Sequence, residues 1–391
     1  MAHDDGLHEA HAACTLGLEA ALTEELTELG YADVRTSRGG VTFRASHRGL
    51  VEACLWLRTA TRVTELLGRG PAFSRESFLE LAAALPWEKW MRVTQTISVD
   101  ATIRDSKVSH SGFAGLVLKD AICDRFRRQV GERPSVNADN PDLPLKLLIV
   151  RDEASIWRDW SGESLHKRGW RPVLVKSPLN EAIAAGLLRL SGWDKKSPLL
   201  DPMCGSGTFL IEGAMWAADR APGLGRSFAF ERWPDIDQKV IATARAAAKA
   251  RGKATLPAPI LGADRHPGAI ALARKGAEAA GVADLVSFTE TSLDQWAPDV
   301  TKPMIVANPP WGERLGEGED LMVSWMDLSR WVRRFPDSTV CVLSGDAGLT
   351  KHLGLRADRK WPLMTGPIEC RWLRYRIDSR PYMGTDTKDT P

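Results

Sequence analysis

The sequence lacks the features of a secreted or membrane-spanning protein. Among its 391 residues, no apolar run approaches the roughly 18–20 residues that a membrane-spanning helix needs. The first residues, Met1 to Asp5, include neither a basic nor an apolar stretch, so we expect no secretion signal. The six cysteines are scattered and form no Cys-x-x-Cys pair, which argues against a zinc site or a disulfide framework. These absences predict a cytoplasmic protein that binds no membrane and no metal.

The balance of charge is also unremarkable over the whole chain, at a net +2. Hydrophobic residues make up 43% and charged residues 26%, as in globular proteins, and the length predicts two or three domains. The stretch from Arg104 to Lys176 contains 14 Lys/Arg and 10 Asp/Glu. It includes basic clusters at 125–128 and 166–171 that also contain Phe or Trp. Solvated helix faces and loops explain most such runs, but the aromatic residues favour RNA contact.

The N-terminal half shows a mixed order of helices and strands. Leucines recur at helical spacing over 17–29, which predicts a helix ended by Gly30. A strand-rich stretch at 34–43 and a helix at 48–57 follow, and strands at 94–103 and 145–150 flank a helix at 113–130. This order predicts compact α+β units. The residues from 384 onward are typical of a disordered tail.

The character of the chain changes after about residue 164, where we place a domain boundary. Apolar strands and Ala-rich helices now alternate, which predicts a mostly parallel sheet covered by helices on both faces. The expected helices span 179–190 and 209–218, and the expected strands span 198–203, 260–263, 286–289, 304–307 and 340–344.

The first of these strands runs into a glycine loop, Asp201-Pro-Met-Cys-Gly-Ser-Gly-Thr208. Glycines 205 and 207 let the backbone approach a ligand, and the free N–H groups of a helix that starts near Thr208 can bind a carboxylate. An acid at the strand end suits an α-ammonium group and would repel a pyrophosphate. S-adenosylmethionine is therefore a better candidate than NAD, although a tight turn alone can explain a Gly-Ser-Gly sequence.

Asp264 ends the next strand, where an acid typically accepts hydrogen bonds from ribose hydroxyls. The interval from Gly207 is 57 residues, against about 20 in dinucleotide-binding proteins. This interval disfavours an NAD-dependent oxidoreductase and predicts an insertion, from Asp219 to about Thr255, that leaves the sheet and returns. The alternative is that Asp264 only caps a helix that begins at Pro267.

The sequence Asn308-Pro309-Pro310-Trp311 follows an apolar strand. Two prolines make a stiff loop that presents carbonyls and no N–H donors. The Asn308 side-chain oxygen and the Pro309 carbonyl are two acceptors suited to an amino group, and Trp311 offers a face for stacking a base. Such a pair could align an exocyclic amine for methyl transfer without a strong base. The alternative is a rigid turn with Trp311 in the core.

With both motifs identified, the chain resembles the THUMP-containing RNA guanine-N2 methyltransferases, most closely the bacterial 23S ribosomal RNA branch. The resemblance covers nearly the whole chain. It rests on 17–19, 55–63, 119–122, 161–169, 201–208 and 308–314, and on 221–223 with 230–233 inside the insertion. It implies an α/β protein in which a Rossmann-like class I methyltransferase domain follows an α+β ferredoxin-like/THUMP RNA-binding region. The implied segments are 1–60 (ferredoxin-like), 61–164 (THUMP), 165–384 (methyltransferase) and 385–391 (tail).

The resemblance also implies S-adenosylmethionine as cofactor and a guanine as target. Asn308, Pro309, Pro310 and Trp311 would hold the guanine. The cofactor would be bound by Asp201, Cys204, Gly205, Gly207, Thr208, Phe209, Asp264, Arg265 and Asp294. Family members often contact adenine through an acid four residues after the Phe of the third strand. That position is Ser292 here, and Asp294 lies two residues later, so either residue could make the contact. His266 also stands where a second acid is common.

RNA is the expected partner, with Lys119, Arg168 and Arg171 as its candidate contacts. The substrate implied by the resemblance is 23S ribosomal RNA, with tRNA as the alternative. An adenine-N6 methyltransferase shares the Asn-Pro-Pro-aromatic chemistry, and a non-catalytic RNA-binding assembly factor is a further alternative of a different class.

Overall fold

The computed structural model describes residues 6–107, 110–171, 179–311 and 321–378. These residues form two compact units. Unit 1 contains the described residues up to Arg171, together with Asn180–Gly186 and Asp219–Lys253. Unit 2 contains the remaining described residues. The tail predicted at 385–391 lies outside the described part of the chain.

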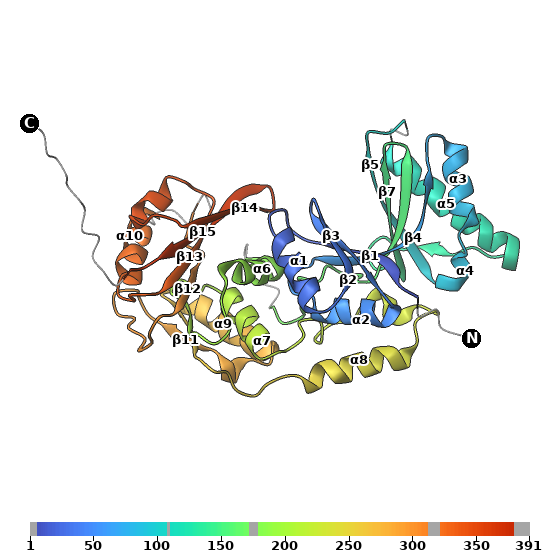
Figure 1. Cartoon of the computed structure of the whole chain (residues 1–391). Helices are drawn as coiled ribbons and strands as arrows, with labels where there is room; N and C mark the ends of the chain where they lie inside the picture. The colour runs from blue at the N-terminus through green and yellow to red at the C-terminus, as the bar shows by residue number, and fades with distance from the viewer. Residues whose placement is uncertain (1–5, 108–109, 172–178, 312–320, 379–391) are drawn as a thin grey trace, which may run out of the picture. The chain divides into compact units, whose positions relative to one another are not determined.

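Unit 1 is built on an eight-stranded sheet with the order β2-β3-β1-β4-β8-β7-β5-β6. Its strands are β1 (His8–Ala13), β2 (Ala32–Ser37), β3 (Gly40–Ala45), β4 (Arg62–Pro71), β5 (Thr96–Arg104), β6 (Ser135–Val136), β7 (Leu143–Val150) and β8 (Glu153–Asp159). Its helices are α1 (Glu19–Glu28), α2 (His47–Trp56), α3 (Arg75–Ala84), α4 (Trp87–Trp90), α5 (Ser111–Val130), the 3-10 helix η1 (Ala229–Arg232) and α8 (Gln238–Ala250). Helices α3 and α5 lie side by side, α3 against β4 and α5 against β5 (Figure 1).

The predicted helices of this unit are confirmed because each has an apolar face that packs on the sheet. Leu18, Leu22 and Leu26 are fully buried, as their helical spacing predicts. The strand-rich stretch forms a hairpin of β2 and β3, whose turn needs the positive φ of Gly39 (+80°). The sequence analysis did not identify β1, β4 or β8.

The insertion predicted after Ala218 leaves the sheet that contains β9 and β10, as the long interval before Asp264 indicates. Its residues, Asp219–Lys253, cluster with unit 1. Helix α8 packs against α2, and Trp233 donates a hydrogen bond from Nε1 to the Asp142 carbonyl at 2.8 Å. The insertion is therefore an integral part of the N-terminal unit.

Unit 2 is built on a seven-stranded sheet with the order β11-β10-β9-β12-β13-β15-β14. Its strands are β9 (Leu199–Asp201), β10 (Ile260–Asp264), β11 (Ser287–Glu290), β12 (Met304–Ala307), β13 (Thr339–Ser344), β14 (Arg359–Thr365) and β15 (Ile368–Arg376). Its helices are α7 (Thr208–Ala217), α9 (Pro267–Ala279), α10 (Leu321–Val332) and the 3-10 helices η2 (Ala283–Leu285) and η4 (Leu349–Leu353). Helix α6 (Glu181–Ser191) is divided between the two units after Gly186.

Five neighbouring strands of this sheet, β11 to β13 in the order above, are parallel, which confirms the predicted α/β architecture. The last two are not: β15 runs antiparallel to β13, and β14 antiparallel to β15. The sequence analysis missed this hairpin, whose residues alternate apolar and basic side chains. Because parallel strands bring their carboxyl ends to one edge, the segments that follow β9, β10, β11 and β12 meet there.

The structure also describes the cysteines and the lengths of the helices, which concern the predicted absence of disulfides and of membrane-spanning helices. All six cysteines are free and buried, so none forms a disulfide. Among the described helices, none is long and apolar enough to cross a membrane.

Candidate active site

A cleft of about 300 Å³ lies at the carboxyl edge of the parallel strands in unit 2. It brings together the segments after β9, β10, β11 and β12 and one side of α10. Its lining residues are Pro202, Met203, Gly205, Asp264, Arg265, His266, Thr291, Ser292, Leu293, Asp294, Asn308, Pro310, Ser324 and Asp327. The glycine-loop motif and the Asn-Pro-Pro motif, about a hundred residues apart, therefore open into one space.

The two glycines of the loop have different physical roles. Gly205 lines the cleft with φ +53°, and a Cβ built there meets no atom within 4 Å, so the loop leaves room for a ligand. Gly207 has φ +75°, and a Cβ there would meet Phe288 at 2.8 Å. Gly207 therefore allows the loop to pack closely on β11, while Gly205 leaves the backbone accessible.

Asp264 fastens the glycine loop to the end of β10. Its Oδ2 accepts a hydrogen bond from the Gly205 backbone N–H at 2.9 Å, and its Oδ1 accepts one from the His266 N–H at 2.9 Å. The N-cap of α9 is His266, with no side-chain capping bond, so Asp264 is not the cap of this helix. Each carboxylate oxygen keeps a second lone pair, which can accept from a ligand hydroxyl.

Asp201 lies beneath the cleft and does not line it. Asp201 is 2% exposed, and its Oδ1 accepts a hydrogen bond from the Met203 N–H at 3.2 Å. Burial raises the pKa of its carboxyl well above the ordinary value, and the nearby Asp264 raises this pKa further. In this geometry Asp201 shapes the loop from below, so direct contact with an ammonium group would require the loop to open.

Replacing Asp201 with asparagine is expected to raise Tm by several degrees at pH 7. The isosteric amide removes a buried group that is disfavoured when ionised. Because the pKa in the folded state lies above that in the unfolded state, stability is lost as the pH rises from the ordinary carboxyl pKa through the raised one. The gain should therefore be small at pH 4 and largest at pH 7. Thermal unfolding at both pH values measures it, and an equal gain at each would contradict the assignment.

Four other predicted cofactor residues are buried below the cleft and do not line it. Phe209 is 2% exposed and packs against Trp372 at 5.5 Å between ring centroids, which corrects its expected role as a direct contact. Cys204 and Thr208 are also buried, and burial raises the pKa of the Cys204 thiol well above its usual range. With Gly207, these residues support the loop from the protein interior.

The remaining predicted cofactor residues do line the cleft. Arg265 follows Asp264 at its rim, and both Ser292 and Asp294 lie in its wall. A hydrogen bond from Ser292 is the main cause that lowers the pKa of the exposed Asp294 carboxyl. The two candidates for an adenine contact thus lie together. The sequence analysis missed Ser324 and Asp327, since their helix carries no motif that points to this cleft.

The Asn308 to Trp311 loop is held by two indoles. Trp311 donates from Nε1 to the Asn308 Oδ1 at 3.2 Å, and Trp325 donates from Nε1 to the Pro310 carbonyl at 2.9 Å. Trp311 itself is 6% exposed and contacts Gly345, which corrects the expectation of an open stacking face. Pro309 is buried, whereas Asn308 and Pro310 line the cleft. The loop therefore presents a fixed amide oxygen, and residues 312–314 of the motif lie outside the described part of the chain.

Arg168, one of the three predicted RNA contacts, has a structural role instead. Arg168 is 3% exposed. Its guanidinium donates hydrogen bonds to the backbone carbonyl of Leu165, at 2.6 Å, and to that of Arg58. A buried guanidinium bonded to carbonyls cannot reach a phosphate. The prediction was wrong because a sequence does not distinguish an arginine that braces a turn from one at the surface.

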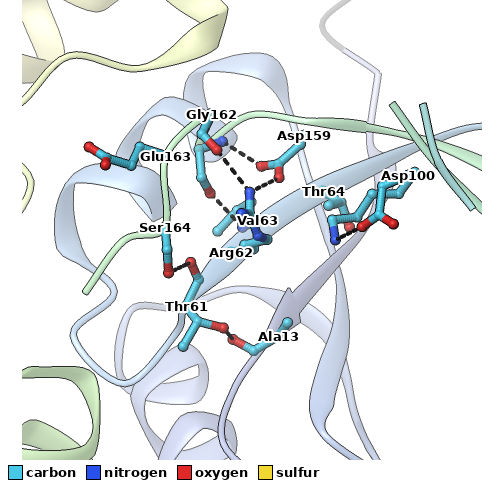
Figure 2. A network of polar contacts seen from close by, with 12 residues as sticks. Ala13, Thr61, Arg62, Val63, Thr64, Asp100, Asp159, Gly162, Glu163 and Ser164 are labelled. Carbon is cyan, nitrogen blue, oxygen red and sulfur yellow. Dashed lines mark hydrogen bonds and ion pairs between the residues drawn. The ribbon is translucent and has the colours of Figure 1, made fainter. Parts of the chain in front are cut away.

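The segment before Arg168 is fastened in the same way (Figure 2). Arg62 pairs with Asp159 and donates to the Gly162 carbonyl at 2.8 Å, and the Ser164 hydroxyl donates to the Thr61 carbonyl at 3.0 Å. These contacts tie residues 159–164 to the start of β4. The Ser-Gly-Glu-Ser sequence of the resemblance is therefore a structural brace in this unit.

The other two predicted RNA contacts differ in exposure. Arg171 donates from Nε to Glu181 Oε1 at 2.6 Å with its side chain 15% exposed, so its charge is already compensated. Lys119, on α5, is 31% exposed beside Asp120 at 3.1 Å. Of the three, Lys119 alone reaches the surface to an extent that suits RNA contact.

One group of described side chains has a spacing that could hold a metal ion: His8, His47 and Glu65, with ligand atoms within 4.8 Å of one another. A cation already occupies this position. Arg158 donates from Nε to Glu65 at 2.6 Å, and its NH2 group lies 3.2 Å from His47 Nε2. The trio is therefore better described as part of a buried arginine network than as a metal site.

Three models of known protein families match parts of the chain. The model of the RMKL-like methyltransferase domain matches residues 168–374. Two further models match the N-terminal half: the RlmL ferredoxin-like domain over 9–64 and the THUMP domain over 74–159. The resemblance seen in the sequence is confirmed by these matches.

Similar proteins include a "Ribosomal RNA large subunit methyltransferase K/L" from Syntrophotalea carbinolica, which is 38% identical over 388 residues. The match covers 96% of this chain and 54% of that protein, so the chain spans about half the length of this relative. The crystal structure of SMU.472 complexed with SAH aligns with a TM-score of 0.86 at 28% identity and covers 96% of this chain and 99% of that one.

A second solved structure, a predicted N6-adenine-specific DNA methylase from Listeria monocytogenes, aligns with a TM-score of 0.86 at 30% identity. It covers 95% of this chain and 96% of that one. The similarity to both structures extends over nearly the entire length of all three chains. Because the model of the methyltransferase domain alone matches more than half of the sequence, this chain belongs to the RMKL-like methyltransferase family.

Proposed function

We propose that this protein transfers a methyl group from S-adenosylmethionine to the exocyclic N2 amine of a guanine in 23S ribosomal RNA. The observation that carries the proposal is the cleft in which a glycine loop, anchored by Asp264, faces Asn308. The name of the Syntrophotalea relative supports ribosomal RNA as the substrate class. RNA processing of this kind also favours the cytoplasm as the location.

The cleft fits S-adenosylmethionine on three observations. Gly205 leaves open the space that a Cβ would occupy, the Asp264 carboxylate has acceptor capacity for ribose hydroxyls, and Ser292 and Asp294 offer polar contacts for adenine. The SAH in the SMU.472 complex is the product that this cofactor leaves after methyl transfer. When bound, S-adenosylmethionine supplies an electrophilic methyl group on a sulfonium.

Asn308 is placed to align the amine. Its Oδ1 accepts from Trp311 Nε1, which fixes the amide orientation and leaves a second lone pair for one amine hydrogen. The Pro309 carbonyl is the proposed acceptor for the other, and because Pro309 is buried and does not line the cleft, this contact requires the carbonyl to turn toward the cleft when the base binds. Holding both hydrogens would localise the nitrogen lone pair and aim it at the methyl group. The protein would then assist the reaction by alignment and electrostatics and not by a strong base. Formation of the C–N bond would be matched by cleavage of the methyl–sulfur bond, with the neutral thioether as leaving group, and the acidic methylated ammonium would then release its proton to water.

Adenine-N6 methylation is the second candidate activity, because the Listeria neighbour carries that description and both reactions use an exocyclic amine. An acceptor pair does not by itself distinguish the two bases. A tRNA guanine is an alternative substrate for the same chemistry, and a non-catalytic assembly factor would keep the RNA contacts without the reaction.

Transfer of tritium from labelled S-adenosylmethionine to protein-free 23S rRNA, 16S rRNA, tRNA and DNA, followed by nucleoside analysis, tests the proposal. We expect label in N2-methylguanosine from 23S rRNA alone. Label in tRNA guanine or in N6-methyladenine would replace the proposal by the corresponding alternative. RNA binding with no transfer to any of these or to ribosomal precursor particles would favour the assembly factor.

A further inference from the structure

A second cavity of unit 2, of about 520 Å³, is not part of the cleft described above. It lies where β13 ends, and its walls come from the segment 344–347, from η4 and its C-terminal side, and from the β14–β15 hairpin. Its volume is within the range of about 300–1,000 Å³ that is usual for small-ligand pockets. The proposed methylation mechanism uses none of its residues.

The segment that forms most of this cavity is strongly basic. From 349 to 376 it holds seven Lys/Arg and two acids. Three of these cations, Lys351, Lys360 and Arg371, line the cavity and are exposed. No ion pair or side-chain hydrogen bond joins any of the three to another described residue. Their charge is therefore available to an anionic ligand.

Two acids also line the cavity, and the carboxylate of one of them already accepts hydrogen bonds from the backbone. Asp346 accepts at Oδ1 from the Gly348 N–H at 2.6 Å and from the Leu349 N–H at 3.1 Å, which caps the turn into η4. Glu369 is exposed on β15 and is the remaining negative charge at the rim. The lining thus keeps an excess of positive charge.

The cavity also has an apolar surface and a tyrosine hydroxyl. Leu355, Ala357 and Leu373 supply the apolar surface. Tyr375 lines the same cavity, is 2% exposed, and has no hydrogen-bond partner among the described residues. Burial raises the pKa of Tyr375 to about 12, so its hydroxyl stays protonated and can donate. The hydroxyl is not among the fully buried polar atoms that lack a partner, so it opens onto the cavity, where it can bond to water or to a polar group of a ligand.

The cavity adjoins the loop that would hold the target base. Gly345 lines the cavity, and a Cβ placed on it would meet the Trp311 ring at 2.7 Å. The same indole donates to Asn308 Oδ1 at 3.2 Å, and Asn308 lines the first cleft. One tryptophan side chain therefore contacts a wall of each site, so a polynucleotide in the first could extend into the second.

A larger groove in unit 1, of about 970 Å³, does not share these properties. Four of its five cations are paired with an acid: Arg62 with Asp159, Lys146 with Asp100, Lys167 with Glu163 and Arg232 with Asp142. The fifth, Arg226, donates to the backbone carbonyls of Ser161, Glu163 and Ser164. Phosphate binding there would first require breaking these ion pairs. The cavity beside Trp311 needs no such rearrangement.

We propose that the cavity beside Trp311 binds an unpaired nucleotide of the substrate RNA next to the target. Its base lies on the apolar surface with a polar edge at the Tyr375 hydroxyl, and the adjoining phosphates contact Lys351, Lys360 and Arg371. This inference rests on the proposed RNA methyltransferase function, and it assigns the RNA contact to unit 2 in addition to the THUMP region.

The charge contacts are tested by the triple variant K351A/K360A/R371A of the full chain. Fluorescence anisotropy with a labelled single-stranded RNA should show a ten- to hundredfold loss of affinity. The slope of log K against log salt should fall by about two, since each lost phosphate contact on a single strand removes about 0.7. Cofactor affinity, measured by calorimetry, should stay within twofold. The control variant K249A/K253A/K275A removes three exposed lysines elsewhere and should bind RNA like the wild type.

The variant Tyr375→Phe tests the base contact, because it removes only the hydroxyl and keeps the buried ring. We expect KM for RNA to rise three- to tenfold with little change in kcat. Wild-type RNA affinity and salt slope in the triple variant, or an unchanged KM in Tyr375→Phe, would overturn the inference. RNA binding that depends on these residues, in a protein that methylates no RNA, would refute the proposed function and leave the binding site supported.

Discussion

The variant Asn308→Ala is expected to transfer methyl groups about 10²–10³-fold more slowly than the wild type, the range found when one aligned polar group is removed from an active site. The affinities for cofactor and RNA should change by no more than about twofold, because alanine removes an acceptor that acts on the amine at the moment of attack. Single-turnover methylation with saturating protein measures the chemical step directly.

Trp311→Phe serves as the matched control for Asn308. It keeps an aromatic ring against Gly345 but removes the N–H that holds the Asn308 amide at 3.2 Å. Loss of one neutral hydrogen bond should reduce the single-turnover rate about three- to tenfold. A fast Asn308→Ala variant would exclude the proposed alignment of the amine. A Trp311→Phe variant as slow as Asn308→Ala would indicate that the ring, and not the amide, carries the effect.

The variant Arg158→Met is expected to lower the free energy of unfolding by about 3–5 kcal/mol, as when one partner of a buried ion pair is removed. Arg158 is fully buried, and its guanidinium donates to Glu65 at 2.6 Å and to Asp235 at 2.8 Å. Its charge also faces the rings of Trp160 and Trp233, at 5.2 and 4.5 Å from their centroids. Chemical denaturation at pH 7 measures the loss.

The carboxylate of Glu65 explains the size of this effect. Burial alone would raise the pKa of Glu65, but the ion pair with Arg158 and the hydrogen bonds from His47 and His8 lower it well below the ordinary value. A lowered pKa in the folded state stabilises the fold above the unfolded pKa, and this stabilisation is lost as the pH falls through the folded value. Without Arg158, the buried carboxylate is no longer compensated at neutral pH.

Two controls separate this network from a general effect of losing an arginine. The double variant Arg158→Met/Glu65→Gln should recover part of the lost stability, since it removes the uncompensated charge. Arg48→Met breaks an exposed pair with Glu52, at 3.0 Å, and should change stability by less than about 1 kcal/mol. Equal losses for Arg158→Met and Arg48→Met would contradict the assigned role.

Much of unit 2 was predictable because its signals are local. An apolar strand followed by glycines, and then by a helix, specifies a loop at the carboxyl end of a parallel strand. Gly205, Asp264 and Asn308 were therefore identified, and the structure places all three in one cleft. The β14–β15 hairpin was missed, although it carries two of the three exposed basic residues of the second cavity, Lys360 and Arg371. Its apolar residues alternate with cations, so its sequence resembles a charged surface segment rather than part of a core sheet.

The assignments that were wrong concern residues whose surroundings come from distant parts of the chain. Arg168 was expected to contact RNA, but its partners include the carbonyl of Arg58, 110 positions earlier. Phe209 follows the glycine loop directly, yet it faces Trp372 instead of the cleft. In each case the residue type and the local motif were consistent with function, and burial decided against it.

The sequence by itself determined the family, the alternation of strands and helices in the α/β region and the two motifs of the candidate active site, because these are set by residue type and spacing along the chain. Only the tertiary structure decided which charges are available. Arg168 and Arg158 are buried, whereas Lys351, Lys360 and Arg371 are exposed around an apolar surface. The physical reason is that desolvation and ion pairing depend on neighbours in space, which are far apart in the chain and leave no local pattern.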